Sequence, residues 1–155
     1  MTDYDRSYGI QKIFDLHAKK DYTPETLFMA ANILDHYIFS IGVENFPKMK
    51  MVNLATVSTL MAAKLEQPIS PSFSRMISLL TEQEQKYVTK QGLIDLEAKI
   101  IETFGFDFNF PGPIQPLERY LRVLDYNLNQ IVFDMAFQIC KFSLNDGKFL
   151  IYRPS

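Results

Sequence analysis

Apolar residues recur every three to four positions along most of this chain, the spacing that places them on one face of an α-helix. In residues 6–19 this face holds Ile10, Ile13, Phe14 and His17, with Lys12, Asp15 and Lys19 elsewhere around the turn. No segment shows the sustained apolar and polar alternation of a half-buried strand. The pattern therefore predicts an all-α protein.

The second predicted helix has a clear start and a clear end. Thr23 is a plausible N-cap, Pro24 suits the first helical position, and Glu25 favours the positive end of the helix dipole. The apolar periodicity then continues to Gly42, a residue that accepts the left-handed conformation common after a helix. A helix of about five turns is expected here.

Residues 48–67 are apolar almost all the way round the predicted helix. They also include a line of small residues: Ala55, Ser58, Thr59, Ala62 and Ala63. Small side chains let neighbouring helices approach closely. We expect this helix at the centre of the bundle.

Prolines and glycines divide the rest of the chain. The expected elements are a short helix at 73–80, a polar stretch to Lys86, a helix after the N-cap Thr89 that ends before Gly105, a linker at 106–113, and helices at 116–124 and 130–142. The linker is the only candidate boundary, so the predicted domains are 1–110 and 111–155.

Charge and cysteine content exclude several classes of protein. The net charge of -2 and the pI of 5.7 leave no positive surplus for nucleic acid or a membrane surface, and neither is expected as a partner. The single cysteine, Cys140, cannot form an internal disulfide, and the first residues lack the features of a signal peptide. An intracellular protein of the nucleus or cytoplasm is expected.

The sequence offers little for catalysis. It has no glycine-rich phosphate loop and no paired histidines with metal-ligand spacing, so no catalytic residue, metal site or cofactor is expected. His17 and His36 fit helix positions better than ligand roles, and Cys140 reads as a small core residue.

Lys64 and Glu97 have unusual settings. Lys64 ends the most apolar predicted helix, and Glu97 lies between Leu96 and Ile100 on an apolar face. Such a pair could orient a partner at the rim of an apolar groove. From periodicity alone, two solvated charges on helix surfaces are the more ordinary interpretation.

Several segments, in order, resemble the cyclin family. Residues 25–38 (ETLFMAANILDHYI) resemble the second helix of a cyclin box, and 60–66 (LMAAKLE) resemble its third. Residues 89–91, 96–97 and 104–108 resemble the fifth helix and its exit, while residues 142–155 resemble the second helix of a following repeat. The resemblance implies a five-helix cyclin box followed by the first two helices of a second, truncated repeat.

The resemblance also implies residue roles and a partner. Lys64 and Glu97 match the lysine and glutamate with which cyclins hydrogen-bond a cyclin-dependent protein kinase, and Arg6 and Asp35 match a buried structural ion pair. The expected function is that of a non-enzymatic regulatory subunit that activates such a kinase in the cell cycle.

At the position of the family's substrate-docking patch the sequence departs from the pattern. Lys12 stands where many cyclins have tryptophan, Asp5 and Gly9 replace apolar residues, and Val52 replaces glutamine. Substrate docking by that route is therefore not expected.

Two other functions stay open. Two helices of a second repeat cannot cover their own apolar residues, which are Ile131, Phe133, Met135, Phe137 and Ile139. Together with the missing patch, this favours as an alternative a cyclin-like scaffold subunit of a larger assembly without kinase regulation. A weaker alternative is the DNA grip of general transcription factors with this fold, which the acidic charge disfavours.

Overall fold

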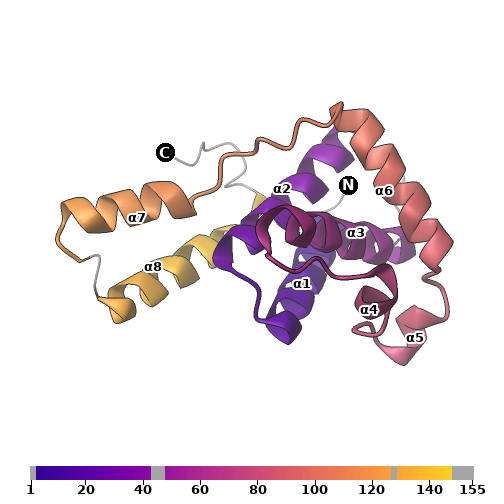
Figure 1. Cartoon of the computed structure of the whole chain (residues 1–155), viewed down its shortest axis with the longest axis horizontal. Helices are drawn as coiled ribbons and strands as arrows, with labels where there is room; N and C mark the ends of the chain where they lie inside the picture. The colour runs from indigo at the N-terminus through magenta and orange to yellow at the C-terminus, as the bar shows by residue number, and fades with distance from the viewer. Residues whose placement is uncertain (1–2, 43–47, 127–128, 148–155) are drawn as a thin grey trace. The chain divides into compact units, whose positions relative to one another are not determined.

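The computed structural model describes residues 3–42, 48–126 and 129–147, and for residues 3–5 and 48–49 only the backbone (Figure 1). Within these ranges all regular structure is helical, which confirms the predicted all-α class. The chain divides into two compact units, Met1–Phe110 and Pro111–Ser155. In the described part, no helix is long and apolar enough to cross a membrane.

The first two helices are α1 (Asp3–Lys20) and α2 (Pro24–Ile41). Pro24 occupies the start of α2 as predicted, and Thr23 before it has extended backbone. The Thr23 hydroxyl accepts no hydrogen bond from a backbone N–H of the helix; its Oγ1 lies 3.3 Å from Oγ1 of Thr26 and accepts a hydrogen bond from Nε2 of Gln67, 3.0 Å away. A tertiary contact has thus taken the place of the expected local cap.

Helix α3 (Lys48–Glu66) lies in the middle of the first unit and packs against α1, α2, α4 and α6 (Figure 1). The small residues identified from the sequence are all buried: Ala55, Ser58, Thr59, Ala62 and Ala63. Thr59 satisfies its hydroxyl within the helix, donating to the carbonyl of Ala55 at 2.8 Å. The central position predicted for this helix is confirmed.

Two short helices follow, α4 (Phe73–Ile77) and α5 (Glu82–Gln85). Helix α4 ends at Ile77, three residues before the predicted end, and α5 lies in the stretch for which only a polar composition was predicted. Thr81 and Glu84 form a reciprocal capping box, in which each side chain bonds the backbone N–H of the other. Two otherwise unpaired backbone groups are satisfied in this way, which stabilises even a one-turn helix.

Helix α6 (Lys90–Phe104) has the predicted ends: the Thr89 side chain accepts a hydrogen bond from the Gly92 N–H, and Gly105 is left-handed with φ 56°. The predicted linker that follows α6 begins with residues whose aromatic side chains are packed. Phe104, Phe108 and Phe110 meet edge to face, and the Phe110 ring stacks on His36 of α2 with centroids 4.4 Å apart. Aromatic packing therefore holds residues 104–110 to the first unit.

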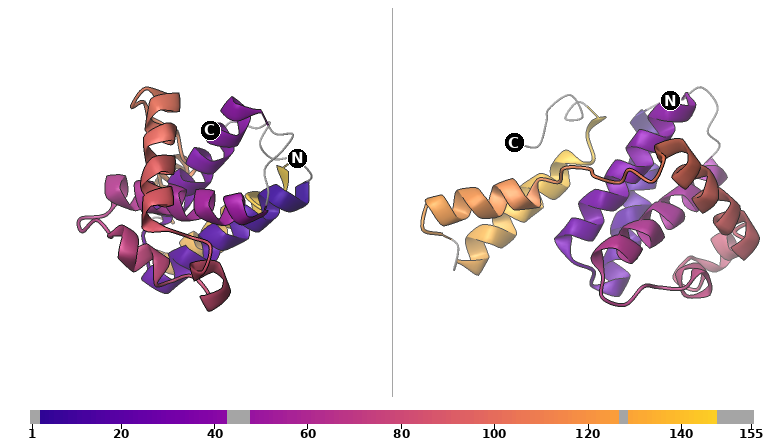
Figure 2. Two further views of the ribbon diagram at one scale, coloured as in Figure 1. Left: turned by 90° about the vertical axis from the view of Figure 1, so that its right-hand side faces the viewer. Right: turned by 45° about the horizontal axis from the view of Figure 1, so that its top comes forward.

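The second unit consists of α7 (Ile114–Val123) and α8 (Gln130–Ser143), which pack against each other (Figure 2). Helix α7 starts two residues earlier than predicted, because Pro116 lies in its first turn. The N–H that a proline lacks would have no partner within the helix at that point. The exit motif expected at residues 148–155 lies outside the described residues.

Candidate functional site

Lys64 lies where α3 leaves the core. From Met51 to Ala63 nearly every residue of this helix is buried, whereas Lys64, Leu65 and Glu66 are exposed. Helix α3 packs against α1, α2, α4 and α6, and its last three residues are the part that reaches the surface. The same helix that forms the core thus presents a cation at the surface.

Glu97 comes from the middle of α6 and meets this cation. Its Oε1 accepts a hydrogen bond from Lys64 Nζ at 2.7 Å, and the two side chains are 16% and 36% exposed, respectively. The structure therefore brings together the two residues that the sequence analysis singled out. An ion pair this accessible contributes at most about 1 kcal/mol to stability.

The Lys64 end of this pair contacts an aromatic ring. Lys64 Nζ lies 4.8 Å from the centre of the Phe73 ring, a favourable cation–π distance. Leu65 and Ile69 keep more than half of their surface exposed on the α3 exit. Charged groups beside exposed aliphatic side chains are typical of a protein-binding surface.

The ion pair expected between the first two helices is present. Arg6 Nε and Nη2 donate to the two carboxylate oxygens of Asp35 at 2.7 and 2.8 Å, and both side chains are largely buried. This two-bond geometry orients the guanidinium and ties α1 to α2. Its role is structural, because little of either charge is accessible to a partner.

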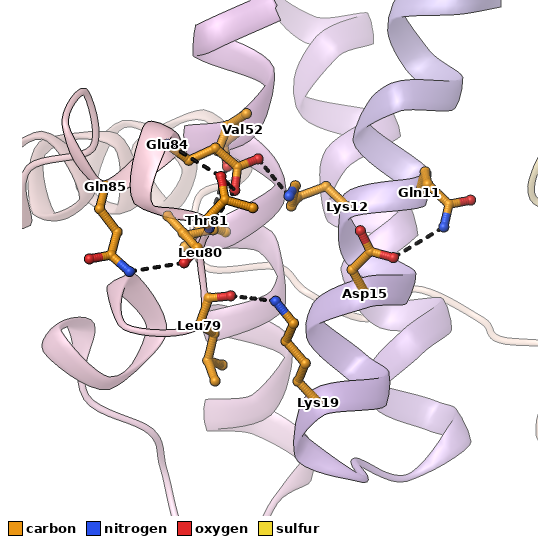
Figure 3. Close-up of polar contacts among 11 residues, drawn as sticks. Gln11, Lys12, Asp15, Lys19, Val52, Leu79, Leu80, Thr81, Glu84 and Gln85 are labelled. Carbon is orange, nitrogen blue, oxygen red and sulfur yellow. Dashed lines mark hydrogen bonds and ion pairs between the residues drawn. The ribbon is translucent and has the colours of Figure 1, made fainter.

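A second buried ion pair was not predicted. Lys12 Nζ lies 2.5 Å from Glu84 Oε1, with side-chain exposures of only 11% and 10% (Figure 3). The Thr81 N–H and hydroxyl also donate to Glu84, each at 2.9 Å, and nearby Lys19 donates to the Leu79 carbonyl at 2.6 Å. Two lysines of α1 therefore hold the segment around α5 against the first helix.

The environment of Glu84 favours its charged form. Burial alone would raise the pKa of this carboxyl, but the hydrogen bonds from Lys12 and Thr81 and the positive charge of Lys12 outweigh burial and lower the pKa below its ordinary value. Glu84 is thus an ionised side chain within a polar network.

The sequence held only part of the signal for this network. Thr81 and Glu84 have the spacing of a capping box, which could have predicted α5. The pairing with Lys12 depends on how α1 packs and has no local signature.

Val52, another departure from the docking pattern, is also fully buried, while the Asp5 side chain lies outside the described residues.

Each of the two histidine side chains contacts a backbone carbonyl oxygen. His17 Nε2 lies 3.0 Å from the Thr23 carbonyl, and His36 Nδ1 donates to the Asn32 carbonyl at 2.9 Å. Among the described residues, no cluster of His, Cys, Asp and Glu could hold a metal ion. Cys140 is half-buried, rather than in the core as expected, and burial raises the pKa of its thiol.

Comparison with known proteins agrees with this architecture. Residues 1–109 match the family model "Cyclin, N-terminal domain". The chain is 28% identical over 150 residues to the G2/mitotic-specific cyclin CLB2 of Candida albicans, covering 97% of this chain and 29% of that protein. It is 24% identical over 155 residues to the G2/mitotic-specific cyclin-B3 of Mus musculus, covering 100% of this chain and 10% of that protein.

The similarity covers nearly all of this chain but only a part of each relative. Cyclin-B2-2 of Oryza sativa subsp. indica is 25% identical over 150 residues, which are 97% of this chain and 34% of the relative. The chain thus spans about a third or less of the length of these relatives. The family model nevertheless covers most of the chain and the whole helical bundle around α3, and we conclude that this protein belongs to the cyclin family.

Proposed function

We propose that this chain is a regulatory subunit that binds a cyclin-dependent protein kinase and activates it. The observation that carries the proposal is the Lys64–Glu97 pair, which joins the exposed end of α3 to the middle of α6 beside exposed apolar side chains. Membership of the cyclin family, with relatives named as mitotic cyclins, supports it further.

The pair has hydrogen-bonding capacity left for a partner. A lysine ammonium carries three N–H donors and a carboxylate has about four acceptor positions, so one mutual bond leaves both groups able to bind further. The partner's backbone could be bound by Lys64 and Glu97, while Leu65 and Ile69 would supply apolar contact area.

Activation would follow from differential binding. A rigid surface that binds the active arrangement of a kinase more tightly than the inactive one shifts the population toward the active form. Phosphoryl transfer would then take place entirely on the kinase.

The test is affinity purification of the chain from cells, followed by mass spectrometry and a kinase assay on the eluate. Lys64→Ala with Glu97→Ala should abolish both the co-purified kinase and the activity. Lys99→Ala with Glu102→Ala is the matched control, because these exposed residues lie on another side of α6. Unchanged kinase recovery with the first double variant would refute the assignment.

A scaffold subunit without kinase regulation is the second candidate function. Lys12 and Val52 are buried, so they offer no accessible surface for substrate docking at the position that the cyclin resemblance indicates. A large assembly recovered without any kinase would favour this function over the first.

Two further expectations complete the proposal. The unit Pro111–Ser155 would correspond to the first two helices of a second cyclin repeat, and the protein would act in the nucleus or cytoplasm. Imaging of a tagged chain in cells tests the second expectation, and a solved structure of the complex tests the first.

A further inference from the structure

A hydroxyl residue stands directly before a proline at Thr23–Pro24 and at Ser70–Pro71. This dipeptide is the acceptor pattern of proline-directed protein kinases. The following proline restricts the acceptor residue to extended backbone, which is the form that a kinase cleft binds. The sequence gives both positions the same pattern, but the structure places them in different surroundings.

Thr23 is poorly placed to be an acceptor. It lies in a connection of three residues between the end of α1 at Lys20 and the start of α2. Its Oγ1 already accepts a hydrogen bond from Gln67 Nε2 at 3.0 Å. Pro24 is itself the first residue of α2, so a kinase could bind this segment in extended form only by unwinding the start of the helix.

Ser70 lies in the connection between α3 and α4, residues 67–72, which has no helical residue (Figure 1). Ser70 is exposed, and so are Pro68 and Ile69 before it and Ser72 after it. The hydroxyl of Ser72 caps α4 by accepting a hydrogen bond from the Arg75 N–H. Ser70 thus combines an exposed position outside the helices with a following proline.

We propose that Ser70 is a phosphorylation site for a proline-directed protein kinase. In the reaction, Ser70 Oγ would form a bond to the γ-phosphorus of ATP held by that kinase, and the bond from this phosphorus to the ADP oxygen would break. The hydroxyl proton would pass to the aspartate base of the kinase. Pro71 would occupy the position after the acceptor.

The modified serine would lie beside the candidate functional site. Lys64 Nζ is 4.8 Å from the centre of the Phe73 ring, so the connection leaves α3 next to Lys64 and returns to it. Ser70 comes three residues before Phe73, which keeps their Cα atoms within about 11 Å of each other. A phosphoserine carries about −1.5 to −2 charges at pH 7. It would therefore compete with Glu97 for the Lys64 ammonium.

Phosphorylation should weaken binding of the partner kinase, a step that rests on the proposed function. Ile69 is 83% exposed and Leu65 is 54% exposed, and both would be buried by a bound kinase. A phosphate on the residue next to Ile69 would lose its water in that interface, which is unfavourable without a dedicated cation. Modification of Ser70 would thus regulate the surface around Lys64.

The acceptor is tested by incubating the purified full chain with ATP and a purified mitogen-activated protein kinase, a proline-directed enzyme, and mapping phosphate by mass spectrometry. Phosphate is expected on Ser70 and not on Thr23. Pro71→Ala should lower its incorporation at least about tenfold, because the backbone restriction is lost. Ser74→Ala, an exposed serine of α4 without a following proline, is the matched control and should have no effect. Absence of phosphate on Ser70, or preference for Thr23, would overturn the site.

The regulatory effect is tested by measuring the affinity of the phosphorylated and untreated chains for the kinase that co-purifies with the protein. Phosphorylation is expected to raise the Kd at least about tenfold. The Ser70→Ala chain, treated with the same enzyme and ATP, is the control and should bind as the untreated chain does. The urea midpoint should be the same for all three chains, since Ser70 is exposed and lies outside the helices.

The two proposals fail in different ways. An unchanged affinity after complete phosphorylation of Ser70 would overturn the regulatory effect. An untreated chain that binds no kinase would instead refute the proposed function, and the phosphate mapping would still decide whether Ser70 is the acceptor.

Discussion

Lys12 and Glu84 form an ion pair with a 2.5 Å separation between Nζ and Oε1, and about nine-tenths of each side chain is buried. Both residues come from stretches that the hydrophobic pattern placed outside the core. Removing two charges from water costs several kcal/mol each, which their attraction and hydrogen bonds must offset. The pair therefore ties α5 to α1, and loss of one member should have a larger effect than loss of both.

Single and double substitutions at this pair test that expectation. Lys12→Met or Glu84→Met alone should lower the free energy of unfolding by about 2 to 4 kcal/mol, because each leaves an uncompensated charge in a buried position. The double variant should lose less than either single variant, since two apolar side chains of similar length replace the pair. Urea unfolding measures all three.

Lys90→Met and Glu82→Met are the matched controls, because both residues are exposed. Each should change the unfolding free energy by no more than about 0.5 kcal/mol. Additive losses at Lys12 and Glu84 would contradict the coupling.

Stability should depend on pH through Glu84. Its pKa in the folded protein lies below the ordinary value of 4.5, so below pH 4.5 the unfolded chain binds more protons at this carboxyl than the folded chain does. The stabilisation is complete above pH 4.5 and is lost as pH falls further, toward the folded pKa. Urea unfolding at neutral pH and at a series of acidic pH values should show a shallower loss for the Lys12→Met, Glu84→Met double variant.

The Arg6–Asp35 pair should matter for stability and not for partner binding. Asp35→Ala should cost about 3 kcal/mol because Arg6 loses both carboxylate bonds in a buried position. Arg6→Lys should cost less, as it keeps the charge but not the two-bond geometry. Thermal unfolding measures both, and kinase recovery well below the melting temperature should be unchanged.

The Lys64–Glu97 pair should show the opposite behaviour. Lys64→Ala and Glu97→Ala are each expected to change the unfolding free energy by less than about 1 kcal/mol, because the pair is accessible to water. Their effect should appear in partner binding instead. A large loss of stability would mean that the pair is structural and that reduced kinase recovery follows from unfolding.

The start of α6 offers a local test. Thr89→Ala should destabilise the protein by about 1 kcal/mol, because the Gly92 N–H loses its acceptor at 3.0 Å. Thr89→Ser retains the hydroxyl and should have little effect. Equal losses for the two variants would show that the methyl group, and not the cap, is what stabilises this end.

Local signals predicted most of the helical structure. Pro24 and Gly42 bound α2, Thr89 and Gly105 bound α6, and the buried residues of α3 follow the predicted pattern. These features are set within a few residues, through backbone conformation and hydrogen bonds near the helix ends, so the sequence alone reveals them.

The wrong predictions for α7 and α5 have physical reasons. Pro116 predicts a helix start at its own position, yet the first turn of α7 accepts it because no helical N–H is needed there. Helix α5 was missed because four polar residues carry no apolar periodicity, although the Thr81 capping box stabilises it. In both cases the decisive interaction involves backbone groups rather than side-chain hydrophobicity.

At the candidate site, too, the sequence predicted some features and the packing of the helices decided others. The sequence indicated Lys64 and Glu97 as unusual charges, and their resemblance to cyclin residues suggested a common role, but the 2.7 Å contact between them depends on how α6 packs on α3. Lys12 had the spacing of an ordinary surface charge. It is buried because α5 packs over α1 and supplies a carboxylate.

By itself, the sequence determined the all-helical class, the central helix, the positions of most helix ends and the family, because each follows from local periodicity, capping or motifs that lie close together in the chain. Only the tertiary structure decided which charges meet, which are buried and which apolar face of α8 stays exposed. Those outcomes depend on contacts between segments that are remote in sequence, and no local pattern encodes them.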